Sequence, residues 1–307
     1  FRFERVNAEN EYGFEWIVRD SFPDEFDTKL LAELLNPDVQ PEVRALASIK
    51  TTDVLFAGMN YANDRMITLN STTLSGRAAW YSYGFFLRNV MAKQLDIDVR
   101  EISVGIRTFQ WDDGALEGEV FVSDALENGA GYVGYFNNRR RFNTLLEDMV
   151  GKYSLEKHFL KNRNCDSSCY DCLRDYSNMD FHGILDWRLA MDMTRLALGM
   201  QVGLSEDWNA YMYRAVRNLC ISRRDWQEIQ FGNLWGAHRG DLAFISVHPL
   251  WNTHGNPHDL HPDIQRAVDA MTERGYVNTF RPPLMFTGST SPADRSGFSW
   301  KLISGEG

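Results

Sequence analysis

The feature that most constrains this chain is a group of three cysteines within eight residues. Cys165, Cys169 and Cys172 follow the spacing C-x3-C-x2-C, and a fourth cysteine, Cys220, lies far downstream. Thiolates gathered at one centre are best stabilised by a soft cation such as Zn²⁺. The spacing therefore predicts a structural zinc knuckle; the alternatives are a disulfide within the group or three reduced thiols in a loop.

Three thiolates leave one corner of a tetrahedron open. A structural zinc site is closed by a fourth protein ligand, whereas a catalytic site keeps a water there. His158, in a predicted helix over residues 154–160, is our first candidate for this ligand, ahead of His182 and then Cys220.

The composition limits the class of protein. The chain has 307 residues, of which 44% are hydrophobic, enough for two domains or one large one. Its formal charge of −10 argues against nucleic-acid binding by the bulk field, so any DNA contact must come from a local basic patch.

No apolar run approaches membrane-spanning length, and we expect a cytoplasmic protein with reduced cysteines and no membrane partner. Because the chain begins at Phe1, we expect a fragment of a longer protein.

The hydrophobic pattern predicts an α/β (α+β) fold, with a mixed sheet, flanking helices and the Cys-rich knuckle, plus a smaller C-terminal α/β unit. Expected helices cover residues 24–35, 76–96, 184–198, 208–221 and 264–274; expected strands cover residues 52–57, 102–106, 119–122 and 242–247. The helix over 76–96 is apolar on most faces and should be buried. We expect a connecting segment over 1–50, a zinc-binding domain over 51–200 and a C-terminal α/β domain over 201–307.

The helix after the cysteines is predicted to be amphipathic. Its apolar stripe consists of Leu185, Leu189, Met193 and Leu196, and the positions between them carry Asp186, Arg188, Asp192 and Arg195. A stripe of this kind predicts one buried and one polar face.

Gly129 and Gly131 follow the strand over 119–122. A Gly-x-Gly at a strand end can cradle phosphate, but this one lacks the third glycine of a dinucleotide fingerprint and the lysine of a P-loop. We favour a structural role, in which the glycines let the chain turn tightly into a helix carrying Tyr135 and residues 145–146.

The main basic stretch begins at Arg139, Arg140 and Arg141 and continues through Lys152, Lys157, Lys161 and Arg163. Such a stretch is either an ordinary solvated face or a contact to the DNA backbone. The three arginines are our candidates for DNA contact.

In this order, the blocks resemble the zinc-binding domain of MrfA-type helicases (the MZB family), and within it the DrmB-type, helicase-associated subunits of DISARM anti-phage systems. The resemblance is carried over about residues 51–200 by residues 76–82, 87–88, 95–98, 124–132, 165–178 and 182–189. It implies that Cys165, Cys169 and Cys172 bind Zn²⁺. Helicase members have an additional upstream cysteine, which is absent here, so a histidine is invoked as the fourth ligand. The resemblance also implies anti-phage defence, contact with double-stranded DNA and a partner that is a superfamily 2, SNF2-like helicase subunit of the DrmA type.

The sequence carries no motor motif. It has no G-x-x-x-x-G-K-[ST] loop and no His-x-Lys, so we expect neither ATP hydrolysis nor a phospholipase-D-like nuclease, and we expect a non-catalytic accessory subunit. The alternative is a metal-dependent nuclease in residues 201–307, built from a late cluster of Trp235, His238, His248, Trp251, His254, His258, Asp259, His261 and Asp263. The prolines among them favour solvated loop histidines instead.

Overall fold

The computed structural model describes residues 51–59, 66–110, 114, 116–161, 165–253 and 259–281, together with three short strands nearer the N-terminus. The chain divides into two compact units, Phe1–Thr51 and Thr52–Gly307. In the first unit, strands β1 (Phe3–Arg5), β2 (Trp16–Val18) and β3 (Glu42–Arg44) form an antiparallel sheet in the order β2-β1-β3. The helix predicted over 24–35 lies outside the described residues.

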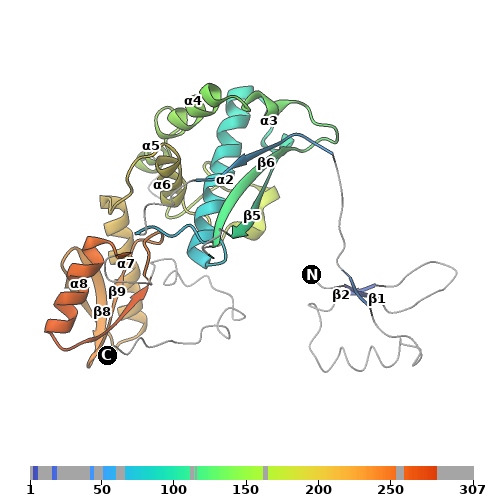
Figure 1. Ribbon diagram of the computed structural model, residues 1–307. Coiled ribbons are helices and arrows are strands. Elements are labelled where there is room, and N and C mark those ends of the chain that lie inside the picture. Colours follow the sequence, from blue (N-terminus) through green and yellow to red (C-terminus); the bar gives the residue numbers. More distant parts are fainter. Residues whose placement is uncertain are drawn as a thin grey trace, which may run out of the picture. The chain divides into compact units, whose positions relative to one another are not determined.

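The second unit begins with a sheet that is covered by a long helix (Figure 1). Strands β4 (Val54–Ala57), β5 (Ile102–Gln110) and β6 (Leu116–Asp124) are antiparallel in the order β4-β6-β5. Helix α2 (Leu74–Leu95) packs against this sheet so closely that a Cβ at Gly84 would lie 2.8 Å from a methyl carbon of Val104. The prediction that this helix is buried on most faces is confirmed, because fourteen of its residues are buried.

Short helices continue the chain around α2. They are η2 (Val99–Glu101), α3 (Tyr132–Tyr135), α4 (Arg139–Val150), α5 (Leu155–Lys161), η3 (Tyr176–Phe181) and α6 (Trp187–Ala197). One helix was expected to follow the glycine turn, but α3 and α4 are separate, since Asn138 is extended and its side chain caps α4. The main hydrophobic core lies among α2, the β4-β6-β5 sheet, α4 and α6.

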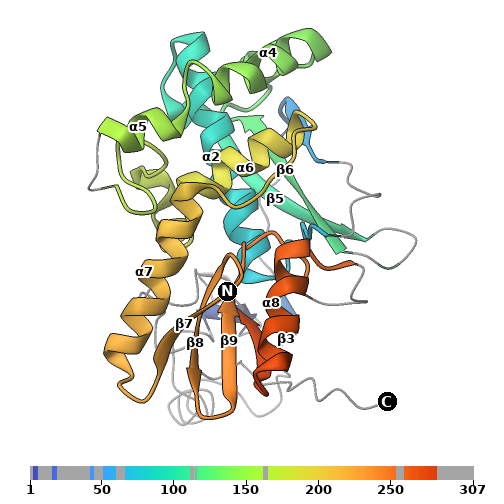
Figure 2. The same cartoon turned by 90° about the vertical axis from the view of Figure 1, so that its left-hand side faces the viewer.

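The rest of the unit is a second sheet with a helix on each face (Figure 2). Strands β7 (Gln227–Phe231), β8 (Leu234–Arg239), β9 (Leu242–Ser246) and β10 (Val277–Arg281) pair in the order β10-β9-β8-β7. Helix α8 (Pro262–Glu273) connects β9 to the parallel strand β10, while α7 (Glu206–Ser222) packs on the other face. The mixed α/β fold expected from the sequence is confirmed, whereas the domain boundary placed after residue 200 stays a prediction.

Candidate metal centre

Four side chains from α5 and the segment after it converge on one point. The ligand atoms of His158, Cys165, Cys169 and Cys172 all lie within 4.8 Å of one another. His158 projects from α5, which ends at Lys161. Among the described residues this is the one group of three or more His, Cys, Asp or Glu side chains that could hold a metal ion.

The spacing of these donors fits a tetrahedral zinc ion. A Zn–S bond of about 2.3 Å places two sulfurs about 3.8 Å apart across a tetrahedron. The Sγ atom of Cys172 lies 3.7 Å from the Sγ atoms of both Cys165 and Cys169, and Cys169 Sγ lies 3.2 Å from His158 Nε2. A disulfide requires about 2.05 Å between sulfurs, so all three cysteines are free thiols. The donor set therefore matches a structural zinc site.

Without a metal ion, the surroundings of two of the thiols disfavour the thiolate form. Interaction with Cys165, followed by burial, raises the pKa of the Cys172 thiol far above its usual value. Burial and the neighbouring Cys172 raise the pKa of Cys169. Thiolates at Cys169 and Cys172 are therefore unfavourable without a cation, and a divalent ion, if bound, would supply the compensating charge and folding free energy.

The backbone around Cys169 makes the turn of the knuckle. The Cys169 N–H donates to Cys172 Sγ over 3.0 Å. The Cys169 carbonyl accepts from the N–H groups of Cys172, Leu173 and Arg174. This turn directs Cys169 and Cys172 to one side, and it buries Leu173 completely.

Helix α2 braces the knuckle from one side. Asn89 Nδ2 donates to the carbonyl of Cys172 over 2.8 Å. The neighbouring Arg88 forms an ion pair with Asp175, and its Nη1 donates to Ser177 Oγ over 3.1 Å. Asp175 in turn is the N-cap of η3, where it accepts from the Ser177 N–H.

Helix α6 braces the knuckle from another side. The Trp187 N–H donates to the carbonyl of Ser167, and Arg188 Nη1 donates to the carbonyl of Asp166. Arg188 is held by an ion pair with the buried Asp186, and its guanidinium lies 4.0 Å from the centre of the Tyr211 ring. Three of the sequence blocks that carried the family resemblance, residues 87–88, 165–178 and 182–189, thus contact one another here.

The other two candidates for the fourth ligand lie elsewhere. His182 Nε2 is engaged with the Asp175 carbonyl at 3.0 Å and with Asn178 Oδ1 at 2.9 Å. Cys220 lies on α7, where it packs with Phe244 and Trp226 in a small cluster. Of the three candidates, the structure places His158 with the cysteines.

The prediction of a polar face on α6 is wrong. Asp186, Arg188 and Asp192 are all buried, and Arg195 is partly buried. Asp192 Oδ2 accepts from Trp208 Nε1 at 2.7 Å and lies 3.0 Å from His248 Nε2. These polar side chains are buried because their partners come from distant segments of the chain.

The turn at Gly129 and Gly131 has a structural role. Both glycines have positive φ, and Gly131 is the N-cap of α3. The fully buried carboxylate of Asp124 accepts the N–H groups of Ala130, Tyr132 and Val133 at 2.7–3.2 Å. A phosphate bound at this turn would need the same N–H groups.

The three arginines proposed for DNA contact form the first turn of α4. Arg139, Arg140 and Arg141 are exposed. Arg141 donates to the Tyr135 carbonyl and lies over the Tyr135 ring. Further along the basic stretch, Lys157 donates to the carbonyl of Gly151, whereas Arg163 lies outside the described residues.

The histidine-rich segment does not form a single site in the described part of the chain. His248 was expected in a solvated loop, but it is completely buried. Its Nδ1 accepts the Leu250 N–H, so Nε2 carries the proton donated to Asp192. His261 caps α8 and stacks on Trp251 at 3.7 Å, and His254 and His258 lie outside the described residues.

Sequence reasoning missed the bracing residues, above all Asn89, Trp208 and the pairing of Arg88 with Asp175. Local spacing carries no signal for them, because each partner is at least 16 positions away along the chain.

Among the described residues, no helix is long and apolar enough to cross a membrane.

Fold and site together define a mixed α/β protein with a Cys3His cluster suited to a structural metal ion. Comparison with known proteins adds one relative, Druantia protein DruE of Escherichia coli (strain UMEA 4076-1), which is 33% identical over 109 residues. The aligned region is 34% of this chain and 5% of DruE, so the chain spans a small part of that protein. No family model and no solved structure matches the chain.

Proposed function

We propose that this chain is a zinc-stabilised, non-catalytic module of a bacterial anti-phage defence system. The similarity to DruE, an anti-phage defence protein, supports the defence role. The Cys3His cluster supports the zinc, because its donors already have the separations that the ion requires.

Within such a system, the module works as an accessory to a DNA helicase or translocase, as a DrmB-type subunit would beside a DrmA-type motor. The knuckle is suited to binding a partner, since a bound metal ion can hold the loop over residues 165–172 in one conformation without a large hydrophobic core around it. Tyr170 and Tyr176 are exposed on the surface of the knuckle, with their rings 6.0 Å apart, and exposed aromatic side chains are enriched where proteins bind partners.

The module also contacts DNA through Arg139, Arg140 and Arg141. Positive charges at the start of a helix oppose the helix dipole, so these arginines do not stabilise α4. A phosphate backbone placed there would interact favourably with the guanidinium groups, while Asn138 keeps the first N–H groups of the helix. The chain's net negative charge would restrict this contact to the local patch.

The observation that carries the proposal is the convergence of His158, Cys165, Cys169 and Cys172. The test is a pull-down from the native host, combined with a phage plaque assay. We expect a helicase to co-purify with the natural chain, and we expect Cys169→Ser to lose both the helicase and protection. Cys220→Ser is the matched control, because Cys220 lies outside the Cys3His cluster. This variant should retain both the helicase and the protection against phage. A chain that protects without any motor partner would refute the proposal.

The non-catalytic assignment has its own test against the nuclease alternative. His248 is an unsuitable ligand for a reactive metal, because it is buried and committed to Asp192 and Leu250. Incubation of DNA with the chain and Mg²⁺ or Mn²⁺ should give no cleavage. Cleavage that is abolished by His248→Ala would favour the nuclease.

A further inference from the structure

The aromatic side chains that are exposed in the described part of the chain are of two kinds. They are Phe56, Tyr135, Tyr170 and Tyr176. The first two are each covered by an arginine of this chain. The Arg107 guanidinium lies 4.4 Å from the centre of the Phe56 ring, and the Arg141 guanidinium lies 4.1 Å from the centre of the Tyr135 ring. The negative face of an aromatic ring attracts a cation in this way.

Tyr170 and Tyr176, on the surface of the knuckle, have no such cation. They are 59% and 84% exposed, and within the described residues no lysine or arginine lies over either ring. Their ring centres are 6.0 Å apart, and Tyr170 meets the His182 ring edge-on at 5.5 Å. The exposed faces of both rings are therefore available to a cation from another molecule.

The charges beside these rings are mostly negative, since residues 165–182 contain four aspartates and one arginine. Two of the aspartates form ion pairs within the chain, namely Asp166 with Arg214 and Asp175 with Arg88. Asp171 and Asp180 are exposed and form no ion pair within the described part of the chain. The arginine, Arg174, donates to Ser168 Oγ over 2.8 Å instead. Such a surface attracts a basic partner and disfavours phosphate groups.

The fold of the knuckle holds both tyrosines in place. Tyr170 lies between Cys169 and Cys172, so a metal ion bound to the cluster would also fix the backbone that carries Tyr170. Tyr176 is the first residue of η3 and directly follows its N-cap, Asp175. Side chains that are positioned in advance lose less conformational freedom when a partner binds.

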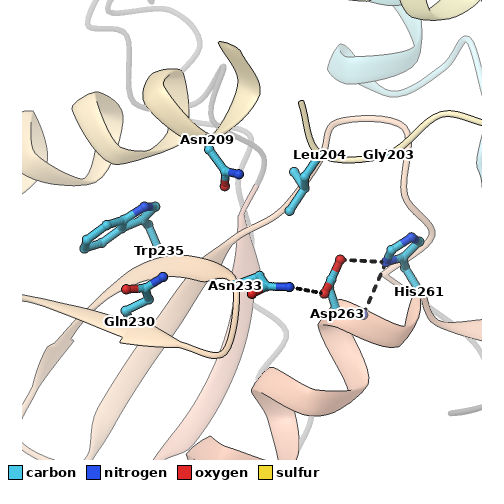
Figure 3. A pocket seen from close by; sticks show the side chains of 8 residues that line it. All are labelled: Gly203, Leu204, Asn209, Gln230, Asn233, Trp235, His261 and Asp263. Carbon is cyan, nitrogen blue, oxygen red and sulfur yellow. Dashed lines mark hydrogen bonds and ion pairs between the residues drawn. The ribbon is translucent and has the colours of Figure 1, made fainter. Parts of the chain in front are cut away.

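The pocket beside the second sheet is another place at which a cation could bind. It has a volume of about 420 Å³ and lies among the segment before α7, α7 itself, the β7–β8 hairpin and the start of α8 (Figure 3). Of the residues that line it, one, Asp263, is acidic. Asp263 Oδ1 accepts from Asn233 Nδ2 at 3.0 Å, as Figure 3 shows, and from Arg266 at 2.6 Å. Because this carboxylate is already paired with an arginine of the chain, the knuckle is the better site for an arginine from outside.

We propose that the knuckle surface binds an arginine-containing segment of a partner protein. The knuckle surface consists of Tyr170, Asp171, Tyr176 and Asp180. A guanidinium group would lie over an exposed tyrosine face and pair with one of the two carboxylates. Arginine is preferred over lysine, because its planar group stacks on aromatic rings and is more weakly hydrated. The inference rests on the proposed function, since it names the chemistry by which a helicase partner would be held.

A labelled, acetylated tetra-arginine peptide is the probe, and its binding to the purified full chain is followed by fluorescence anisotropy. Tetra-citrulline, which has nearly the same shape without the charge, is the negative control. We expect the arginine peptide to bind, the citrulline peptide not to bind, and tetra-lysine to bind more weakly than tetra-arginine. Because the negatively charged chain attracts any cationic peptide, the decisive variants leave the net charge unchanged.

Tyr170→Leu and Tyr176→Leu should each weaken binding of the arginine peptide about two- to fivefold, the effect of one exposed cation–ring contact. Their Tm should be nearly unchanged, because both side chains are exposed. Tyr170→Phe keeps the ring and should keep the binding. Tyr135→Leu is the matched control, because Arg141 already covers that ring, and it should bind the peptide like the natural chain.

Asp171→Asn combined with Asp180→Asn should weaken the binding and reduce its salt dependence. Equal binding of tetra-citrulline, no binding of tetra-arginine, or leucine variants that bind like the natural chain would each overturn the proposal. So would loss of binding in Asp263→Asn, which would place the peptide in the pocket, or a short oligothymidylate that binds through the tyrosines instead. The titration needs no helicase, so its failure is distinguishable from a pull-down that recovers no motor.

Discussion

Replacement of Arg88 by methionine tests whether α2 holds the knuckle in place. The Arg88 side chain is 3% exposed, and that of its partner Asp175 is 22% exposed. Removing one partner of a fully buried ion pair costs about 3–5 kcal/mol. Because Asp175 is partly hydrated and keeps its bonds from Ser177, we expect a loss of about 2–3 kcal/mol of unfolding free energy. For a unit of this size the loss lowers Tm by roughly 4–12 °C.

The assay combines a thermal melt with the rate of zinc release to a chelator. Arg88→Met should also release zinc faster, because Asp175 caps η3 immediately after the knuckle. Arg100→Met is the control: Arg100 is paired with Asp98 in an exposed ion pair, so its replacement should leave both readouts unchanged. An Arg88→Met chain that melts and releases zinc like the natural chain would refute the bracing argument.

Two further predictions concern the remaining site residues. His158→Ala should lower the bound zinc well below one ion per chain. His182→Ala should retain the zinc, because His182 is bonded to Asp175 and Asn178 instead. Metal analysis after dialysis checks both variants, and the reverse result would make His182 the ligand. Replacing Arg139, Arg140 and Arg141 together by alanine should weaken duplex DNA binding, with the melting temperature of the protein nearly unchanged. The slope of log binding constant against log salt concentration should fall by roughly one unit for each phosphate that an arginine no longer neutralises. Fluorescence anisotropy at several salt concentrations measures this slope, and an unaltered slope would exclude these arginines from the DNA interface.

The sequence predicts the long elements of this fold well. Helices α2, α7 and α8 and strand β9 lie close to their predicted ranges, because each has a continuous hydrophobic pattern. Among the described strands, β1, β2, β3, β7, β8 and β10 were missed. Strand β7 shows why: it has five residues and a mostly exposed surface, so local alternation carries little signal.

In the candidate site, too, residues close together in the sequence could be predicted, whereas contacts between distant segments could not. Cys165, Cys169 and Cys172 could be grouped from spacing, and the structure places His158, the first of three candidates from the sequence, beside them. Asp192 and His248 could not be recognised as a buried pair, because 56 positions separate them and each looks like an ordinary surface residue in its own segment. Such a pair becomes visible only when α6 and the loop after β9 are placed together.

X-ray absorption at the zinc edge of the purified full chain tests the central claim most directly. We predict one zinc per chain, with three sulfur neighbours at about 2.3 Å and one nitrogen at about 2.0–2.1 Å. A folded chain with substantially less than one zinc, or a zinc ion surrounded by oxygen and nitrogen alone, would contradict the account.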